Sequence, residues 1–312
     1  MAEPDMLFID TDPGVDDALA ILMAHAHASG IAGLGIAAGN VGLHHTTANA
    51  LKLVELLDAP TPVFPGAPQP LVRRAADAAF VHGADGFGDT GYLPARRVAH
   101  NEHAALALLR LSHAHAGELV VVALGPLTNL ALALSLDPQL PRRVARLVVM
   151  GGAVTGQGNT SLAAEFNIGF DPEAAHIVFS RWPRFDLVDW ELTLRHALDF
   201  ERFDHWLAGD DARAAFFSAI SRKARAFNRM QQRPGLLAAD ALAMAVALRP
   251  GLITRSDERA VTVELDGGLT RGATVVDWQR RSGAVANARI VMAVDQSGFE
   301  HLVAAALGAL PG

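Results

Sequence analysis

Hydrophobic and polar positions along the chain alternate between two kinds of segment. Short, almost uninterrupted apolar runs of strand length are each followed by a longer stretch in which apolar residues recur with the period of a helix. Four such pairs occur, at 6–10 and 16–28, 31–38 and 45–58, 118–125 and 127–137, and 146–152 and 172–181. Apolar strands joined by helical crossovers are typical of a parallel sheet that is covered on both faces. The pattern therefore predicts an α/β fold with a mostly parallel central sheet and helices on both faces.

The pattern changes in the last third of the chain. Residues 201–230 and 239–249 have helical periodicity, and three strand-like segments follow at 261–265, 272–277 and 288–295, which we expect to add edge strands to the sheet. The chain contains no repeat of fixed period and no Pro/Gly/Ser-rich linker long enough to separate domains. We therefore expect a single domain over residues 1–312.

Composition narrows the classes of protein to which the chain can belong. Of its 312 residues 51% are hydrophobic, which is enough for a large core, and the 26 basic residues are scattered in a chain of net charge −7, so nothing indicates nucleic-acid binding. The absence of cysteine excludes disulfides, zinc-thiolate sites and a cysteine nucleophile. Residues 1–6 do not resemble a secretory signal, and no apolar stretch reaches membrane-spanning length. We expect a cytoplasmic protein with no membrane partner.

The first strand ends in an unusually acidic segment, FIDTDPGVDDALAILMA at 8–24, which contains Asp10, Asp12, Asp16 and Asp17. Ligand sites of parallel sheets form at the carboxyl ends of the strands, where this segment lies. Carboxylates at this density repel one another and are costly to desolvate, so we expect a cation or a reacting substrate nearby. Oxygen ligands without histidine or cysteine indicate Ca²⁺ or Mg²⁺ rather than zinc. The alternative is that Asp16 or Asp17 only caps the following helix.

An ordered set of motifs is spread over nearly the whole chain. It consists of DTDPGVDDALAIL at 10–22, AAGN at 37–40, VHGADG at 81–86, ALGPLTN at 123–129, VVMGG at 148–152, GNTSLAAEFN at 158–167 and AAD at 238–240. In this order the segments resemble the motifs of the inosine/uridine-type nucleoside hydrolase family. The resemblance implies a central parallel sheet, hydrolysis of the N-glycosidic bond of ribonucleosides in nucleoside salvage, and assembly into a homodimer or homotetramer.

The resemblance also implies roles for particular residues. Asp12, Asp17, Asp240 and the backbone carbonyl of Leu124 would bind a Ca²⁺ ion, which would also hold the attacking water and the ribose 2′ and 3′ hydroxyls. Asp12 would be the general base, and Asp10 would support it from behind. The residues expected to contact ribose or orient water are Asp16, Asn40, Asn159, Glu165 and Asn167.

This residue set suits the chemistry. Hydrolysis of an N-glycosidic bond passes through a ribosyl cation similar to the oxocarbenium ion of glycoside hydrolysis, so the site must supply nearby negative charge and oxygen acceptors. Carboxylates and amides around the sugar supply both, and a carboxylate next to a positioned water can take its proton.

The chain departs from the family pattern at Ala239, where many members carry a histidine that protonates the leaving base. His82, in the VHGADG motif, is one candidate for that role. Other candidates are Arg229 or Arg233, and stacking of the base on Trp190 or Phe227. Purine-preferring members also lack this histidine, which favours purine nucleosides.

Two other functions are compatible with parts of the sequence. A haloacid-dehalogenase-like phosphohydrolase also places a DxD motif after its first strand, but it needs a lysine near the phosphate, and Lys52 and Lys223 both lie in helical segments. A ribose- or nucleoside-binding protein that has lost hydrolysis is the second alternative, which Ala239 raises.

Overall fold

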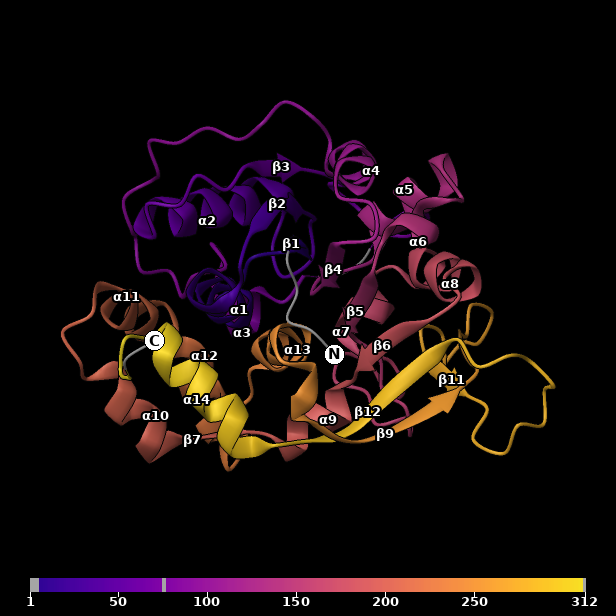
Figure 1. The fold of residues 1–312 in the computed structure, drawn as a ribbon. Coiled ribbons are helices and arrows are strands. Elements are labelled where there is room, and N and C mark those ends of the chain that lie inside the picture. Colours follow the sequence, from indigo (N-terminus) through magenta and orange to yellow (C-terminus); the bar gives the residue numbers. More distant parts are fainter. Residues whose placement is uncertain (1–5, 75–76, 311–312) are drawn as a thin grey trace.

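The central element of the fold is an eight-stranded sheet with the strand order β3-β2-β1-β4-β5-β6-β12-β9. The computed structural model describes residues 6–74 and 77–310 (Figure 1). The strands, in sheet order, are β3 Val63–Pro65, β2 Ile31–Ile36, β1 Met6–Thr11, β4 Leu119–Ala123, β5 Arg146–Met150, β6 Phe185–Val188, β12 Ala288–Val294 and β9 Ile253–Arg259. Every neighbouring pair is parallel except β12 and β9, which are antiparallel. The predicted mostly parallel α/β sheet is confirmed.

Alternate residues of the strands face two separate hydrophobic cores. In β1, Leu7 and Ile9 pack in the core that contains α1 and α13, whereas Phe8 packs in the core that contains α4, α5 and α8. This alternation follows from the two-residue period of a strand, and it leaves both faces of the sheet covered by helices (Figure 1). The helices of the first core are α1 Val15–His27, α2 Leu43–Leu56, α9 Trp190–Arg195, α10 Phe200–Leu207, α11 Ala212–Ile220, α12 Arg222–Met230, α13 Ala239–Leu248 and α14 Gln296–Ala306.

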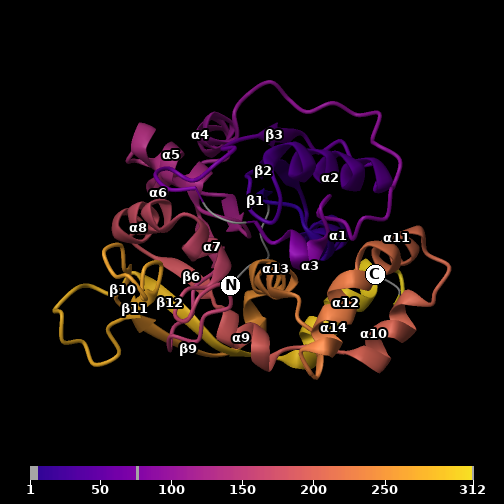
Figure 2. The ribbon, with the colours of Figure 1, turned by 180° about the vertical axis from the view of Figure 1, so that it is seen from behind.

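The second core and the loops around the sheet contain the remaining helices. These are α3 Ala79–His82, α4 Ala104–Ala114, α5 Thr128–Leu136, α6 Leu140–Arg143, α7 Phe166–Phe170, α8 Pro172–Arg181 and a 3₁₀ turn at Pro250–Leu252. Helices α10, α11, α12 and α14 gather at one end of the molecule, where the C-terminus lies (Figure 2). No helix among the described residues is long and apolar enough to cross a membrane.

The four strand and helix pairs expected in the first part of the chain are confirmed as β1–α1, β2–α2, β4–α5 and β5–α8. The expectation that all three late strand-like segments form sheet edges is wrong. Residues 288–294 form β12, an interior strand between β6 and β9. The other two segments pair with each other as β10 Val261–Val263 and β11 Thr274–Val276, outside the main sheet. A second small sheet joins β7 Leu198–Asp199 to β8 Gly235–Leu236.

One of the two edges of the main sheet is β9, which the apolar pattern does not reveal. Its sequence is ITRSDER, and all seven of its residues are exposed or only half-buried. Charged residues are common on edge strands because they discourage pairing with another chain. The polar composition that hides β9 in the sequence therefore agrees with its position. Residues 1–5, 75, 76, 311 and 312, which complete the expected domain of 1–312, lie outside the described residues.

Candidate functional site

The acidic segment forms a tight turn between β1 and α1, and Asp17 holds this turn together. Its Oδ2 accepts hydrogen bonds from the main-chain N–H of Gly14 (2.9 Å) and from Nδ2 of Asn40 (2.9 Å). Its Oδ1 accepts the hydroxyl of Thr11 at 2.5 Å. Asp17 is fully buried. The carboxylate therefore caps the start of α1 and also connects the turn to the loop after β2.

Asp12 is buried beneath the same turn with one oxygen unsatisfied. Its Oδ2 accepts the main-chain N–H of Asn40 at 2.7 Å, whereas its buried Oδ1 has no hydrogen-bond partner among the residues that the structure describes. Two glycines allow the surrounding loops to come this close, since a Cβ added at Gly39 would lie 2.1 Å from Oδ2 and one added at Gly125 would lie 2.4 Å from Oδ1. A buried carboxylate oxygen without a partner is costly, so this atom is free to bind a proton, a water molecule or a cation.

Three carboxylates from two elements converge beside Asp12. The half-buried Asp16 and the buried Asp17 belong to α1, and Asp240 belongs to the first turn of α13. One oxygen of each lies within 4.8 Å of the others, an arrangement that could hold a metal ion. Burial, together with the charges of Asp16, Asp17 and Asp12, raises the pKa of Asp240 well above its ordinary value. Divalent cations relieve such repulsion, and the all-oxygen donor set fits a hard cation.

Burial also raises the pKa of Asp12 well above its ordinary value, with the charge of Asp17 as the second cause. Asp10 lies behind the turn, where its Oδ1 accepts Nδ2 of Asn129 at 2.8 Å, and burial raises its pKa to about 7. The expected metal group was Asp12, Asp17, Asp240 and the Leu124 carbonyl. The carboxylates that the structure brings within metal-binding distance of one another are those of Asp17 and Asp240 with Asp16 in place of Asp12.

The side chains of Glu165 and Asn167 hold the opposite side of the site. Glu165 caps α7, because its carboxylate accepts the main-chain N–H groups of Asn167 (2.9 Å), Ile168 (3.2 Å) and Gly152 (2.9 Å). Burial raises the pKa of Glu165 to about 7. Nδ2 of Asn167 donates to the carbonyl of Leu124 at 2.6 Å. A carbonyl oxygen has two lone pairs, so this hydrogen bond leaves the Leu124 oxygen able to accept a second partner.

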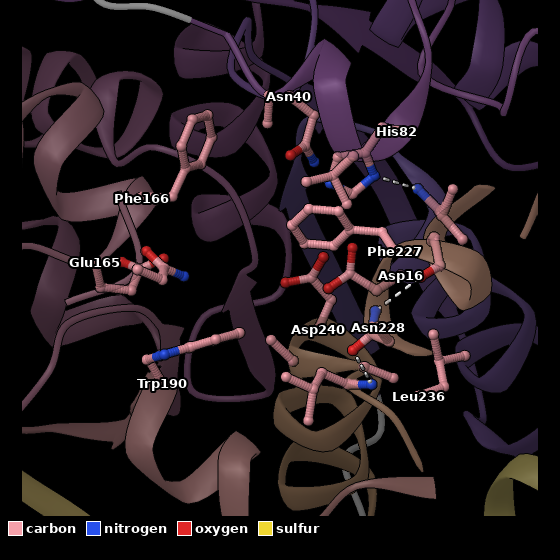
Figure 3. Close-up of a pocket in the computed structure, with 18 of the residues that line it drawn as sticks. Asp16, Asn40, His82, Glu165, Phe166, Trp190, Phe227, Asn228, Leu236 and Asp240 are labelled. Atoms are coloured by element: carbon pink, nitrogen blue, oxygen red, sulfur yellow. Dashed lines mark hydrogen bonds between the residues drawn. The ribbon is translucent and has the colours of Figure 1, made fainter. Parts of the chain in front are cut away.

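These groups surround a cavity of about 380 Å³. Asp16 and Asp240 lie at its base, and Glu165, Phe166 and Trp190 lie across from them (Figure 3). The exposed loop residue Asn159 also lines the cavity, as do Asn40, Leu124 and Asn167. Asp10, Asp12 and Asp17 are buried and are not among its lining residues. A cavity of this size, into which several polar side chains converge, is typical of a small-molecule site.

His82 lies at the edge of the cavity in a defined hydrogen-bonding state. Its Nδ1 accepts the main-chain N–H of Val15 at 3.0 Å, which assigns the ring proton to Nε2. Burial lowers the pKa of His82 to about 4. The ring is therefore neutral near pH 7, and it can donate a hydrogen bond from Nε2 but does not carry an additional proton.

Residues that are far apart in the sequence line another part of the cavity. Helix α12 packs against α3, which brings Phe227 to 5.9 Å from Phe80, measured between ring centroids. Trp190 and Arg233 also line the cavity, as expected for contacts to a leaving base. Arg229 does not line it, because its guanidinium lies over the ring of Phe200 and pairs with Asp204 at 2.7 Å.

Phe80, Phe166 and Asn228 also line the cavity and were not among the predicted site residues. Phe80 could have been found from its position two residues before His82, and Asn228 from its position next to Phe227. Nδ2 of Asn228 donates to the carbonyl of Ala224 at 2.9 Å, so this side chain is fixed within α12. Ala239 also lines the cavity and presents only a methyl group there.

The chain is similar over nearly its whole length to proteins of a known family. The family described as inosine-uridine preferring nucleoside hydrolase matches residues 7–301. The non-specific ribonucleoside hydrolase RihC of Salmonella enteritidis PT4 is 36% identical over 299 residues, which cover 96% of each protein.

Two solved structures have nearly the same fold over almost their whole length. An inosine-guanosine nucleoside hydrolase (IG-NH) is 33% identical with a TM-score of 0.91, covering 98% of this chain and 99% of that one. A purine-preferring ribonucleoside hydrolase from Gardnerella vaginalis is 29% identical with a TM-score of 0.89, covering 97% and 98% respectively. The chain therefore belongs to the inosine-uridine preferring nucleoside hydrolase family, and it is a hydrolase that acts on the N-glycosidic bonds of ribonucleosides.

Proposed function

We propose that the chain hydrolyses ribonucleosides to free base and ribose in a Ca²⁺-dependent reaction, with Asp12 as the general base. The observation that carries this proposal is the unpartnered Oδ1 of Asp12, buried beneath a cavity whose base is made by further carboxylates. An isolated carboxylate oxygen in that position is suited to accept a proton from a water molecule above it.

The proposed Ca²⁺ ligands are Asp12, Asp17, Asp240 and the carbonyl of Leu124, with Asp16 beside them. The oxygen-only donor set supports a hard cation, and the raised pKa values of Asp12 and Asp240 indicate carboxylates that need a positive partner. A bound Ca²⁺ would supply positive charge that offsets the crowded carboxylates and favours ionisation of a nearby water. We also propose that Asp10 supports Asp12 from behind, since it is buried and fixed by Asn129.

The residues that we propose to hold ribose are Asp16, Asn40, Asn159, Glu165 and Asn167, all of which line the cavity. Glu165 and Asn167 are fixed by the capping and carbonyl hydrogen bonds described above, so they need little reorganisation when a sugar binds. Their oxygen acceptors would stabilise the positive charge that develops on ribose as the base leaves.

We propose a preference for purine bases, which would contact the aromatic side chains that line the cavity, Phe80 and Phe227 on one side and Trp190 across from them. Ala239 offers no proton donor to the leaving base, and three aromatic rings line the cavity. Both features favour a base that stacks well and accepts a proton readily. The names of the inosine-guanosine and purine-preferring relatives support the same preference. In this scheme His82 is a catalytic group whose neutral ring donates from Nε2 to the leaving base. Arg233 is the second candidate for that role.

The remaining parts of the proposal rest on the family resemblance. We propose a homodimer or homotetramer, located in the cytoplasm, that acts in nucleoside salvage and purine metabolism. The phosphohydrolase alternative is less well supported, because neither Lys52 nor Lys223 lines the cavity and Lys223 pairs with Asp89.

The experiment that tests the proposal is incubation with a panel of ribonucleosides while reducing sugar is measured, with and without a chelator. We expect release of ribose that is fastest from purine nucleosides and is lost after chelation. Tight ribose binding with no release from any nucleoside would instead favour the binding-protein alternative. Release of inorganic phosphate from phosphate esters would favour the phosphohydrolase.

A further inference from the structure

A second, smaller cavity adjoins the first one and is strongly basic. Its volume is about 270 Å³, and its polar lining consists of Arg73, Arg74, Arg271, Thr160 and Ser161. No carboxylate is among the described residues that line it. Such a concentration of guanidinium groups is unexpected on a chain of net charge −7.

Two residues belong to both cavities. Thr160 and Phe166 line the first cavity and the second. Figure 3 shows Phe166 on the far side of the first cavity from Asp16 and Asp240. Thr160 directly follows Asn159, one of the proposed ribose contacts. The two cavities therefore meet at Thr160 and Phe166, and Phe166 lies across the first cavity from its carboxylates.

Only one of the three arginines is neutralised by an acidic partner. Arg271 pairs with Glu173 at 2.5 Å and also donates to the carbonyl of Leu265 at 2.7 Å. The exposed side chains of Arg73 and Arg74 make no hydrogen bond or ion pair with any residue that the structure describes. Two guanidinium groups with unused donors thus remain next to the cavity, and the hydroxyl groups of Thr160 and Ser161 can donate to the same ligand.

This donor set fits a phosphate group. Guanidinium groups bind phosphate oxygens through paired, charge-assisted hydrogen bonds, and hydroxyl groups often complete such sites. In the proposed function the 2′ and 3′ hydroxyls of ribose face the carboxylate group, so the 5′ carbon is the ribose position left to carry a phosphate towards the second cavity.

We propose that the cavity lined by Arg73, Arg74 and Arg271 binds a phosphate group esterified to the 5′ carbon of a ribose held in the first cavity. The inference rests on the proposed function for the position of the ribose. It extends the class of ligands from nucleosides and ribose to their 5′-phosphorylated forms.

The test is a calorimetric titration of the full-length, Ca²⁺-loaded protein with ribose, ribose 5-phosphate and inorganic phosphate. We expect ribose 5-phosphate to bind at least about tenfold more tightly than ribose, the factor that one hydrogen bond to a charged group supplies. The double variant R73A/R74A should lose this advantage and keep the affinity for ribose. The matched control R280A/R281A removes the same charge from an exposed loop and should keep the advantage.

Three results would overturn the inference. One is equal affinity for ribose and ribose 5-phosphate in the wild-type protein. A second is an advantage that persists in R73A/R74A, which would mean that the phosphate binds elsewhere, for instance at the Ca²⁺ ion. The third is binding of inorganic phosphate without any advantage for the ester, which would assign the arginines to a free anion.

A failure of this inference can be distinguished from a failure of the proposed function. Ribose release from nucleosides is measured on the same samples, and R73A/R74A should retain it. If nucleosides are hydrolysed but the phosphate ester gains nothing, only the further inference fails. If no nucleoside is hydrolysed, the proposed function fails, whatever the titrations give.

Discussion

The main-chain N–H of Asn40 donates to Oδ2 of Asp12 at 2.7 Å, while the other oxygen of the same carboxylate has no partner within 6–74 and 77–310. The hydrogen bond fixes the rotation of the carboxylate and thereby the direction of its free oxygen. Because Asn40 also donates from Nδ2 to Asp17, one residue of the loop after β2 orients two of the buried acidic groups. The geometry of the acidic turn therefore depends on a loop outside the DTDPGVDD segment.

The first prediction concerns the glycines that allow this close approach. A methyl group at Gly39 or Gly125 would lie 2.1 or 2.4 Å from an oxygen of Asp12 and must displace the carboxylate. We expect Gly39→Ala and Gly125→Ala each to lower kcat by about 100-fold or more, because small misplacements of a catalytic group have effects of that size. Gly42→Ala is the control, since nothing lies within 4 Å of its added methyl group. Normal kinetics in the first two variants would show that the orientation of Asp12 is unimportant.

The second prediction concerns the pH dependence of stability. The pKa of Glu165 is about 7 in the folded protein and near 4.5 in the unfolded chain. The folded state therefore binds more protons between these pH values, so the contribution of Glu165 to stability is lost as the pH rises from about 4.5 to 7. We expect the free energy of unfolding to fall by up to about 3 kcal/mol from this residue over that range.

Urea denaturation at several pH values, at constant metal concentration, measures this effect. Glu165→Gln cannot titrate and should show a weaker dependence on pH, even though loss of an acceptor lowers its overall stability. The same slope in wild type and variant would mean that Glu165 is ionised throughout.

The third prediction concerns the metal. If Asp17 and Asp240 hold Ca²⁺, the ion binds only the folded protein, and Ca²⁺ at about 100 times its Kd should add about 2.7 kcal/mol of stability. We expect the unfolding temperature of the chelated protein to rise by several degrees when Ca²⁺ is restored, and by less in Asp240→Asn. Thermal unfolding with Ca²⁺, Mg²⁺ and no metal measures this. An unchanged unfolding temperature with every cation would rule out the proposed site.

The fourth prediction concerns the leaving base. His82→Ala should lower kcat on natural nucleosides by about 10²- to 10⁴-fold and leave the hydrolysis of p-nitrophenyl riboside nearly unchanged, because p-nitrophenolate departs without a proton. Arg229→Ala, which removes a side chain that faces Phe200 and Asp204 instead of the cavity, should alter neither rate. Equal losses on both substrates in His82→Ala would assign this residue to the sugar or to the turn that it holds through Val15.

Much of the fold could be predicted from the sequence because the first half of the chain repeats one local pattern. Strands such as LVVVA at 119–123 are buried on both faces, so they form apolar runs that contrast with the helices after them. The order of the later strands could not be predicted in the same way. Nothing in the residues of β12 distinguishes an interior strand from an edge, because its neighbours β6 and β9 are set by tertiary packing.

The polar part of the candidate site was predictable for a similar reason. The carboxyl ends of parallel strands meet at one edge of a sheet, so Asp12, Asn40 and Leu124 had to lie near one another once their strands were recognised. The aromatic side was not predictable, because it depends on the packing of α12 against α3, which are far apart in the sequence. The orientation of Arg229 likewise depends on Asp204, a partner on another helix.

The central claim is that Asp12, one of the proposed Ca²⁺ ligands, activates the water that hydrolyses a ribonucleoside. Its most direct test is the rate of ribose release from inosine by the wild-type protein, by the chelated protein before and after Ca²⁺ is restored, and by Asp12→Asn. We predict that Ca²⁺ restores the chelated enzyme, and that Asp12→Asn folds normally but is slower by at least about 10²-fold in the presence of Ca²⁺. A correctly folded Asp12→Asn variant with a near-normal rate would contradict the account.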